Sequence, residues 1–176
     1  MTPAGYQVVP ARREHFAAMR EVERAAELIF PLDVFPLALR GQTLTSDEEF
    51  AEAQGDGLLW CAEAAGGEIV GYAIAFWVGG DLHLDEIDVH PAHQQRGIGR
   101  ALIDVVCAHA RANGASRLTL TTFRCVPWNM PWYERLGFVA FAEEALPPQL
   151  SEIFEEEIAR GLLRERRVAM ALVFAR

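Results

Sequence analysis

The sequence predicts a single domain of the α/β or α+β class, and two observations carry this prediction. Its 176 residues are close to the commonest domain size, and 51% of them are hydrophobic, which is enough for a sizeable core. Segments with the alternating period of strands occur along the whole chain, and in its second half they alternate with segments of helical period. Because no repeat or low-complexity linker interrupts this order, we expect one domain over residues 1–176.

Two helices and four strands are expected in the first half of the chain. Apolar residues recur at helical spacing in the first helix, and Ser46 with Glu49 forms a capping box before the second. Between the two helices, Pro31 and Pro36 interrupt an apolar run, and residues 30–44 receive no assignment. In chain order the expected elements are a strand over 6–10, helices over 13–26 and 47–54, and strands over 58–64, 69–78 and 82–90.

Glycine pairs separate the last three of these strands. Gly66-Gly67 is typical of a hairpin turn, and Gly79-Gly80 marks the next turn. The apolar side chains of strand 82–90 alternate, but with one break in phase between Leu84 and Ile87. This break predicts a local irregularity of the strand.

The second half alternates helices with strands. The first helix begins at Gly99 and ends at Asn113-Gly114, a pair suited to a left-handed helix end, and glycines also follow the two later helices. The expected elements are helices over 99–112, 131–136 and 150–160, and strands over 118–123, 138–141 and 167–174.

The charge balance argues against one class of partner. The chain carries 16 Lys plus Arg and 25 Asp plus Glu, a net charge of -9. Such a surface repels a polyanion, so we expect no nucleic-acid partner. A cationic substrate would be attracted, although an acidic balance is also an ordinary solubility feature. The same two alternatives apply to the acidic run Glu152, Glu155, Glu156 and Glu157, for which a solvated helix face is favoured.

Cysteine usage and hydropathy predict a cytoplasmic protein without a membrane segment. The chain has three cysteines, Cys61, Cys107 and Cys125, and this odd number argues against a disulfide framework. They form no CxxC motif and have no zinc-ligand spacing with histidine, so we expect no metal site. The first residues lack the basic and apolar regions of a secretion signal. No apolar run approaches the roughly 18 residues of a membrane span.

The segment from Val89 to Leu102 carries the strongest chemical signal, because it runs from a strand through a glycine-bearing loop into a helix. A helix start presents unpaired backbone N–H groups and the positive end of the helix dipole, and Gly97 and Gly99 let an anion approach the backbone. An ordinary strand-to-helix turn is the alternative. The loop lacks the third glycine of a dinucleotide-binding turn and the Lys-Ser/Thr of a nucleoside triphosphate loop.

Two motifs in this order resemble the GNAT superfamily of N-acetyltransferases. The QxxGxG pattern at 94–99 is similar to the family's coenzyme A pyrophosphate signature, and the stretch 87–91 before it looks like the family's fourth strand. The segment WYERLGF at 132–138 is similar to its later tyrosine and Leu-Gly-Phe segment. Residues 72–141 match well, and the element order on both sides matches too.

The resemblance implies a mixed, mostly antiparallel sheet of about seven strands flanked by helices and splayed between its fourth and fifth strands. It also implies acetyl-coenzyme A as co-substrate, with the pantetheine arm between these strands and the pyrophosphate on the glycine-bearing loop. The residues that it assigns to the coenzyme are Ile87, Asp88, Val89, Gln94, Gln95, Arg96, Gly97, Ile98, Gly99, Arg100 and Asn129.

Acyl transfer to an amine requires two proton movements. Attack on a thioester requires a neutral amine, whereas an alkylamine is mainly protonated at neutral pH, so a base is needed. The resemblance favours an acidic residue at the strand irregularity: Glu86 is the first choice of base, with Asp85 and His83 as alternatives. Tyr133 occupies the position from which the family commonly protonates the departing thiolate. The structural alternative for the carboxylates is that they are solvated or paired with an arginine. The structural alternative for Tyr133 is a core tyrosine whose hydroxyl is bonded elsewhere.

The stretch before this tyrosine departs from the family's pattern and resembles a subgroup with a Pro-Trp-Asn insertion. Many members carry an asparagine seven positions before the tyrosine, where this chain has Val126, and Asn129 lies only four before it. We expect Asn129 to cap the following helix or to contact the pantetheine. Trp128 and Trp132 either line the acceptor pocket or pack in the core. Cys125 has no obvious activating partner, which disfavours a covalent acetyl-cysteine route.

These observations predict an N-acetyltransferase that moves an acetyl group from acetyl-coenzyme A to a primary amine by direct attack in a ternary complex. The alternatives are a GNAT-like domain that binds acetyl-coenzyme A as a sensor, and a P-loop-like nucleotide protein, which the missing Lys-Ser/Thr disfavours. The acceptor stays open among small amines, antibiotics, amino acids and protein N-termini or lysines. A homodimer is the expected oligomer, with the apolar strand 167–174 as a candidate seam.

Overall fold

A seven-stranded mixed sheet runs through the protein, whose computed structural model describes residues 2–42 and 44–175. Positions 1, 43 and 176 lie outside the described residues. All three belong to the predicted domain 1–176, and position 43 also belongs to the unassigned stretch 30–44. The strand order is β1-β2-β3-β4-β5-β7-β6. Neighbouring strands are antiparallel except for β4 and β5, which are parallel. The predicted fold class, a single α/β domain with a mixed and mostly antiparallel sheet, is confirmed.

The observed elements agree closely with those predicted from the sequence. The strands are β1 Tyr6–Pro10, β2 Leu59–Ala64, β3 Ile69–Val78, β4 Asp81–Val89, β5 Arg117–Phe123, β6 Val139–Ala140 and β7 Arg167–Val173. The helices are α1 Phe16–Glu27, α2 Asp47–Gly55, α3 Ile98–Ala112, α4 Met130–Arg135 and α5 Pro148–Ala159. Two differences stand out: the predicted helix 13–26 divides into a 3-10 turn, Arg13–His15, and α1, and β6 is shorter than the predicted 138–141. Phe138 donates its backbone N–H to Tyr133 O at 3.1 Å and so closes the end of α4 instead of pairing in the sheet.

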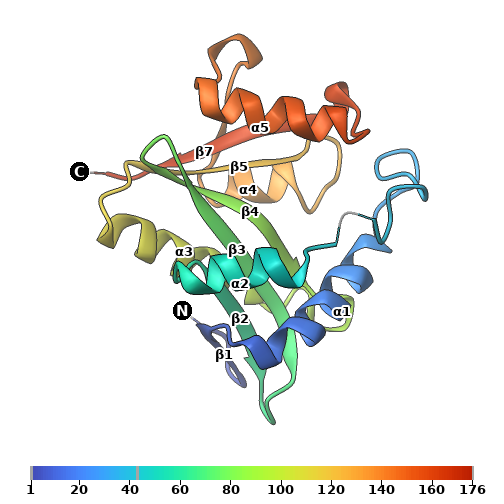
Figure 1. Cartoon of the computed structure of the whole chain (residues 1–176), viewed down its shortest axis with the longest axis vertical. Coiled ribbons are helices and arrows are strands. Elements are labelled where there is room, and N and C mark those ends of the chain that lie inside the picture. Colours follow the sequence, from blue (N-terminus) through green and yellow to red (C-terminus); the bar gives the residue numbers. More distant parts are fainter. Residues whose placement is uncertain (1, 43, 176) are drawn as a thin grey trace.

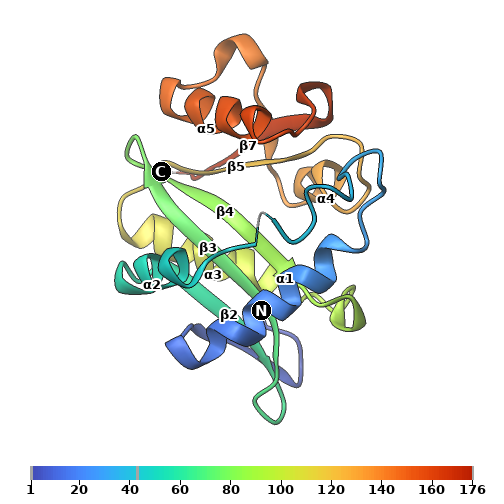
Figure 2. The same cartoon turned by 45° about the vertical axis from the view of Figure 1, so that its right-hand side comes forward.

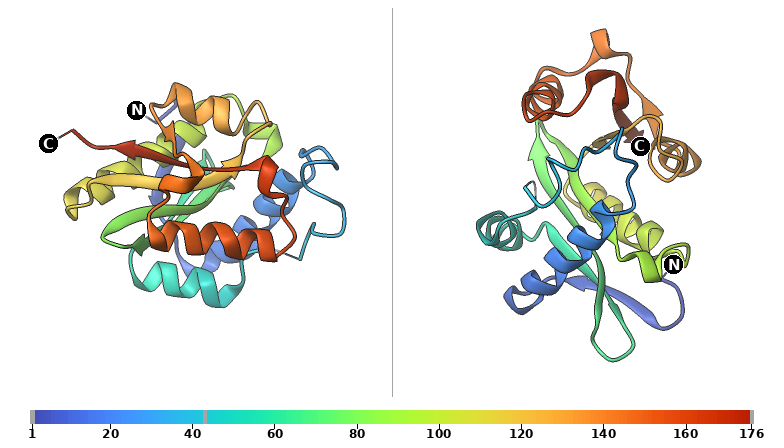
Figure 3. Two further views of the ribbon diagram at one scale, coloured as in Figure 1. Left: turned by 90° about the horizontal axis from the view of Figure 1, so that it is seen from above. Right: turned by 90° about the vertical axis from the view of Figure 1, so that its right-hand side faces the viewer.

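Helices cover both faces of the sheet. Helices α1 and α2 lie on one face of β2, β3 and β4, and α3 lies on the other (Figure 1; Figure 3, right). The first face buries a cluster around Phe16, Met19 and Phe50, and the second buries a larger cluster around Leu102 and Val106. These are the apolar stripes that helical spacing in the sequence predicts, and their burial supplies most of the driving force for this packing.

Local sequence signals set the helix ends and turns. Ser46 Oγ accepts from Glu49 N at 3.2 Å, and Glu49 Oε2 accepts from Ser46 N at 2.7 Å, so the predicted capping box is present at the start of α2. Gly114 has a φ of 84° after α3, which confirms the predicted left-handed helix end. In the unassigned stretch, Pro31 and Pro36 each begin a turn by accepting a backbone hydrogen bond.

A β-bulge divides β4 into two halves with different side-chain phase. Ile74 pairs with Glu86 and Ala75 pairs with Leu84, which leaves Asp85 without a partner on β3. The extra residue keeps the apolar side chains of both halves on the α3 face and turns Glu86 toward α1. This is the irregularity that the break in phase between Leu84 and Ile87 predicts.

The sheet opens between β4 and β5 beyond the bulge. The two strands pair in parallel only over Leu82–Leu84 and Leu118–Leu120, and they then diverge (Figure 2). The edge of β4 that follows the bulge therefore has no strand partner on its β5 side within the described residues. The predicted splay between the fourth and fifth strands is present.

Three further expectations concern the exterior and the cysteines. None of the helices in the described part of the chain has the length and apolar character needed to cross a membrane. All three cysteines are free thiols. Strand β7, the candidate dimer seam, lies between β5 and β6 and is not a free sheet edge at Met170 and Ala171, where β6 pairs with it. The homodimer stays a prediction.

Candidate active site

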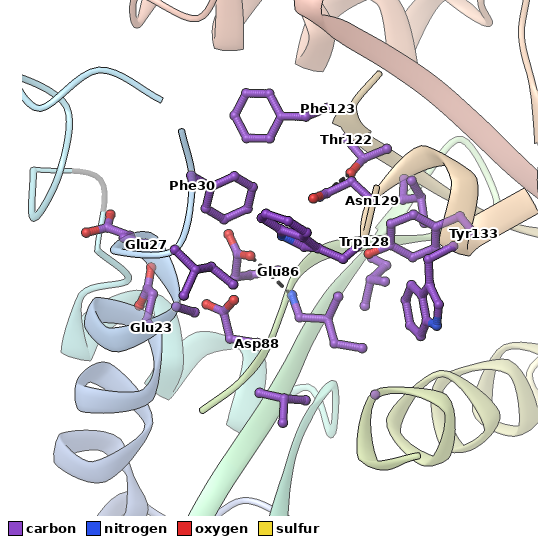
Figure 4. Close-up of a pocket in the computed structure, with 18 of the residues that line it drawn as sticks. Glu23, Glu27, Phe30, Glu86, Asp88, Thr122, Phe123, Trp128, Asn129 and Tyr133 are labelled. Carbon is purple, nitrogen blue, oxygen red and sulfur yellow. Dashed lines mark hydrogen bonds between the residues drawn. The ribbon is translucent and has the colours of Figure 1, made fainter. Parts of the chain in front are cut away.

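A cavity of about 880 Å³ opens where β4 and β5 diverge. Its walls come from the end of α1, the second half of β4, the loop into α3, β5 and the segment that leads into α4. Figure 4 shows carboxylates on one side of this cavity and Asn129 and Tyr133 on the other, with Phe30 and Trp128 between them. A concave surface of this size with converging polar groups is the usual form of a small-molecule site.

The loop between β4 and α3 has the backbone form of an anion site. Gln95 has a φ of 60° and Gly97 a φ of 84°, so both lie in the left-handed region. Gly97 is the N-cap of α3 and offers no side chain to the first N–H groups of the helix. The first helical hydrogen bond runs from Ala101 N to Gly97 O at 3.0 Å. Left-handed residues followed by an uncapped helix start are typical of backbone nests that bind anions.

Two polar side chains of this loop fold back onto the protein. Gln94 Nε2 donates to Val89 O at 3.1 Å and ties the loop to the end of β4. Arg96 donates to the Tyr6 hydroxyl at 2.8 Å and to Ala92 O at 3.0 Å. Arg96 is also the one predicted coenzyme residue that does not line the cavity. The donors that this loop offers a ligand are therefore mainly backbone N–H groups.

The backbone favours glycine at only one of the two glycine positions of the loop. A Cβ at Gly97 would meet only Pro3 at 3.6 Å, so its positive φ is what favours glycine there. A Cβ at Gly99 would lie 3.4 Å from the Trp132 ring. This is an ordinary van der Waals distance, and Gly99 has no positive φ, so the contact with Trp132 does not by itself require glycine at this position.

The bulge turns two carboxylates of β4 into the cavity. Glu86 and Asp88 both line it, and among the described residues neither forms an ion pair with an arginine or histidine. Glu86 Oε1 accepts from Ile87 N at 3.3 Å. Asp85, the unpaired residue of the bulge, is exposed toward the same cavity.

Helix α1 contributes two further carboxylates, which the sequence motifs did not single out. Glu23 is only 4% exposed, and both its oxygens accept from Thr45 N at 3.1 Å. Glu27 accepts from Gly41 N at 2.8 Å. Figure 4 shows these two side chains and those of the β4 carboxylates gathered along one side of the cavity. We call the group Glu23, Glu27, Glu86 and Asp88 the acidic wall.

One sequence signal for Glu23 existed. It lies between Val22 and Ala26 on the face of α1 that is otherwise apolar and buried. A carboxylate on the buried stripe of an amphipathic helix is costly unless it has a partner or a function. Such a residue is a reasonable site candidate even without a motif.

Burial and mutual repulsion raise the pKa of three carboxylates of the acidic wall, Glu23, Glu86 and Asp88. Burial, together with the charges of Asp88, Glu23 and Asp85, raises the pKa of Glu86 well above its usual value. Burial and the charges of Glu23 and Glu27 raise the pKa of Asp88 in the same way. The wall is therefore an environment in which an added positive charge would be stabilised.

Replacing Glu23 with Gln is expected to stabilise the protein more at pH 8 than at pH 5. Burial raises the pKa of Glu23 from 4.5 to about 7, so between these values the unfolded chain loses a proton that the folded protein keeps. The free energy of unfolding of the wild type therefore falls as pH rises through this window, and Gln removes that fall of about 1–3 kcal/mol. Urea unfolding at both pH values measures the difference. The exposed control Glu52→Gln should show no such pH dependence, and an equal effect of Glu23→Gln at both pH values would contradict the raised pKa.

Tyr133 faces the cavity from α4 with a free hydroxyl. Its ring packs edge-on against Trp132 and Phe138, with centroids 4.9 and 5.4 Å away. Among the described residues the hydroxyl has no hydrogen-bond partner, so the alternative of a hydroxyl bonded elsewhere is wrong. Figure 4 shows it directed into the cavity. Burial and the charges of Glu86 and Asp88 raise the pKa of Tyr133, which keeps the hydroxyl protonated and able to donate.

Asn129 presents an unpaired acceptor to the same cavity. Its Nδ2 donates to Thr122 Oγ1 at 2.8 Å, and its Oδ1 is buried without a donor. It is the N-cap residue of α4 but makes no side-chain cap, because the backbone oxygen alone accepts from Trp132 N and Tyr133 N at 2.8 and 3.0 Å. Asn129 therefore caps α4, as one of the two expectations had it, but through its main chain and not its side chain. Trp128 and Trp132 both line the cavity.

Two residues considered from the sequence lie outside the cavity. His83 is 1% exposed, its Nδ1 lies 3.0 Å from Thr119 Oγ1, and burial lowers its pKa to about 4. It is a neutral core histidine and is poorly placed to act as the base. Cys125 has a partner after all, because the Arg166 guanidinium lies 3.3 Å from its sulfur, but it does not line the cavity.

Comparisons with known proteins identify the fold. The model of the acetyltransferase (GNAT) family matches residues 19–138. The ribosomal-protein-S18-alanine N-acetyltransferase from Escherichia coli is 21% identical, with a TM-score of 0.67 over 97% of this chain and 95% of that chain. The PaiA N-acetyltransferase from Thermoplasma acidophilum, in complex with coenzyme A, is 14% identical, with a TM-score of 0.71 over 99% and 100%. A GNAT family acetyltransferase from Brucella melitensis, in complex with acetyl-CoA, is 20% identical, with a TM-score of 0.61 over 97% and 89%.

Proposed function

This chain belongs to the acetyltransferase (GNAT) family, and we propose on that basis that it transfers an acetyl group from acetyl-coenzyme A to a primary amine by direct attack in a ternary complex. One observation carries the proposal. A single cavity joins the free edge of β4 to a carboxylate at its bulge, Glu86, and to the unbonded hydroxyl of Tyr133. These are the two proton-transfer groups that the reaction requires.

The coenzyme is proposed to bind mainly through the main chain. The free edge of β4 after the bulge suits an extended pantetheine arm, which would add to the sheet as a strand does. The left-handed loop and the start of α3 suit the pyrophosphate. Arg96 supports this loop through Tyr6. We assign to the coenzyme the main chain of Ile87, Asp88 and Val89, together with the cavity-lining residues Gln94, Gln95, Gly97, Ile98, Gly99, Arg100 and Asn129.

In the proposed reaction the amine nitrogen attacks the thioester carbonyl carbon. A C–N bond forms, the C–S bond breaks, and the amine proton passes to Glu86 directly or through water. The departing thiolate takes a proton from Tyr133. The raised pKa of Glu86 makes it a stronger base than an ordinary carboxylate, and the buried Tyr133 hydroxyl stays protonated until the thiolate forms.

Release of coenzyme A thiol from acetyl-coenzyme A in the presence of a panel of primary amines tests this function. We expect amine-dependent thiol release and an acetylated product of matching mass. The chain contains no lysine, so acetyl-lysine recovered in such an assay cannot come from the enzyme itself. Tight binding of acetyl-coenzyme A without thiol release for any amine would favour the sensor alternative.

Replacing Gly97 with Val is expected to weaken acetyl-coenzyme A binding by about tenfold or more. This is the loss of affinity expected when a few backbone hydrogen bonds to an anion are broken. A β-branched residue is strained at a φ of 84°, so the loop would reorganise and its N–H groups would turn away from the pyrophosphate. Calorimetric titration with acetyl-coenzyme A measures the effect.

The matched control for this variant is Gly114→Val at the opposite end of α3. Gly114 has the same φ of 84° with nothing within 4 Å of an added Cβ, and it does not line the cavity. It should lose similar stability and keep coenzyme affinity. Equal affinities in the two folded variants would mean that the pyrophosphate binds elsewhere.

A further inference from the structure

We propose that the acceptor is an aliphatic diamine or polyamine whose second ammonium group binds to the acidic wall between Asp88 and Glu23, while its attacking amine faces Glu86. The proposal rests on the acetyltransferase function proposed above and specifies its acceptor. Three independent features of the cavity carry it: uncompensated negative charge, unpaired hydrogen-bond acceptors, and an aromatic pair beside the carboxylates.

Three carboxylates of the wall, Glu23, Glu86 and Asp88, have no cationic partner in the described part of the chain. Four arginines line other parts of the cavity, and three of them form ion pairs with carboxylates outside the wall: Arg167 with Glu157 at 2.6 Å, Arg100 with Asp104 at 2.8 Å and Arg160 with Glu156 at 3.8 Å; the fourth is Arg135 of α4. Buried carboxylates that repel one another cost stability, which points to a cationic ligand that compensates them.

Asn129 gives a separate indication that the ligand brings hydrogen-bond donors. Its Oδ1 is buried in the cavity wall without a donor, and its Nδ2 is already bonded to Thr122. Asp88 likewise has no hydrogen-bond donor among the described residues. Asn129 Oδ1 and Asp88 are thus unsatisfied acceptors on opposite sides of the cavity, in addition to the Tyr133 hydroxyl, which can donate. An ammonium group carries three donors and no acceptor, so a ligand that carries one complements unsatisfied acceptors such as Asp88.

Aromatic rings line the space between these two sides. Phe30 and Trp128 lie with their ring centroids 6.1 Å apart, and Figure 4 shows both beside the acidic wall. Ring faces stabilise an ammonium group and also pack well against methylene carbons. A short alkyl chain with a cation at each end fits such a surface better than an amine with a polar neutral tail.

Binding of this second cation should depend on pH. A cation favours the ionised carboxylates and must displace the protons that the raised pKa values retain. The titratable groups that line this part of the cavity are Glu23 and Glu27 from α1, Glu49 from α2, Asp85, Glu86 and Asp88 from β4, and Tyr133 from α4. Tyr72 of β3 is buried, with its hydroxyl 3.4 Å from Thr45 Oγ1. The preference for a diamine should therefore be greater at pH 8 than at pH 6.

The test compares 1,4-diaminobutane with n-butylamine and 4-aminobutan-1-ol, which have similar chain length but lack the second charge. Calorimetric titration of each amine into the enzyme with and without coenzyme A gives affinities that do not depend on turnover. We expect the diamine to bind roughly tenfold to a hundredfold more tightly than either monoamine at pH 8, the usual effect of one charge-assisted contact. The ratio of kcat/KM values for the same amines is the second readout.

The decisive variant is Asp88→Asn, and its control is Asp56→Asn, which removes the same charge from an exposed position outside the cavity. Asp88→Asn leaves in place the main chain of β4 through which residue 88 is assigned to the coenzyme. It should therefore lose most of the preference for the diamine while it keeps its affinity for coenzyme A, and Asp56→Asn should keep both. Equal binding of diamine and monoamines by the wild type, or the same preference in both variants, would overturn the proposal.

Two further outcomes separate this proposal from the proposed function. A diamine preference that disappears in Asp88→Asn, without thiol release for any amine, would support the cation site and contradict catalysis. Thiol release with monoamines as good as diamines would support catalysis and overturn the cation site. A peptide with a lysine next to its free N-terminus, bound more tightly than the diamine, would overturn the assignment to a small amine.

Discussion

Tyr133→Phe is expected to lower kcat by roughly tenfold to ten-thousandfold, the ordinary range for loss of a general acid. The hydroxyl has no partner among the described residues and faces the cavity, so its removal takes away the proton donor for the thiolate without breaking a structural hydrogen bond. The ring should continue to pack against Trp132 and Phe138. Steady-state kinetics with an amine acceptor measures the loss.

Two controls show whether this loss is chemical. The affinity for acetyl-coenzyme A, measured by calorimetry, and the thermal unfolding midpoint should both stay close to those of the wild type. A fully active Tyr133→Phe enzyme would mean that the thiolate leaves unaided or takes its proton from water. A large fall in coenzyme affinity would instead assign the hydroxyl to binding.

Glu86→Gln is expected to lower kcat/KM for an alkylamine by roughly a hundredfold or more within one range of pH. Burial and the neighbouring carboxylates raise the pKa of Glu86, so at low pH the wild type also lacks an ionised base and the two enzymes become similar. At high pH the free amine is abundant and needs no base. The defect should therefore be greatest above the pKa of Glu86 and below that of the amine.

A weakly basic amine provides the contrast that identifies a base. Such an acceptor is already neutral over the range in which the alkylamine is protonated, so it should partly escape the defect of Glu86→Gln. The measurement is the pH profile of kcat/KM for both enzymes with both amines. Equal losses at every pH with both acceptors would remove Glu86 from the base role and leave it a binding residue.

Much of the fold could be predicted because its signals are local. The capping box of Ser46 and Glu49, the left-handed Gly114 and the helical stripe of α3 each depend on residues within a few positions of one another. The bulge of β4 could also be predicted locally, because the break in alternation between Leu84 and Ile87 is visible within the strand itself. The predicted length of β6 was wrong because two elements compete for the same backbone group. The N–H of Phe138 closes the end of α4 and is therefore not available to pair in the sheet.

The sequence by itself determined the element order, the bulge and a glycine-bearing loop before α3, and the resemblance of that loop directed attention to Glu86 and Tyr133. Only the tertiary structure decided that Glu23 of α1 faces Asp88 of β4 and that the Tyr133 hydroxyl is free. The physical reason is that helix caps and strand phase arise from neighbouring residues, whereas the pKa and the hydrogen-bond partners of a side chain depend on groups that the fold brings from distant segments. A lone carboxylate on the apolar stripe of a helix indicates a buried ionisable group. Its pKa and its function depend on the charged groups of the strand that packs against that helix.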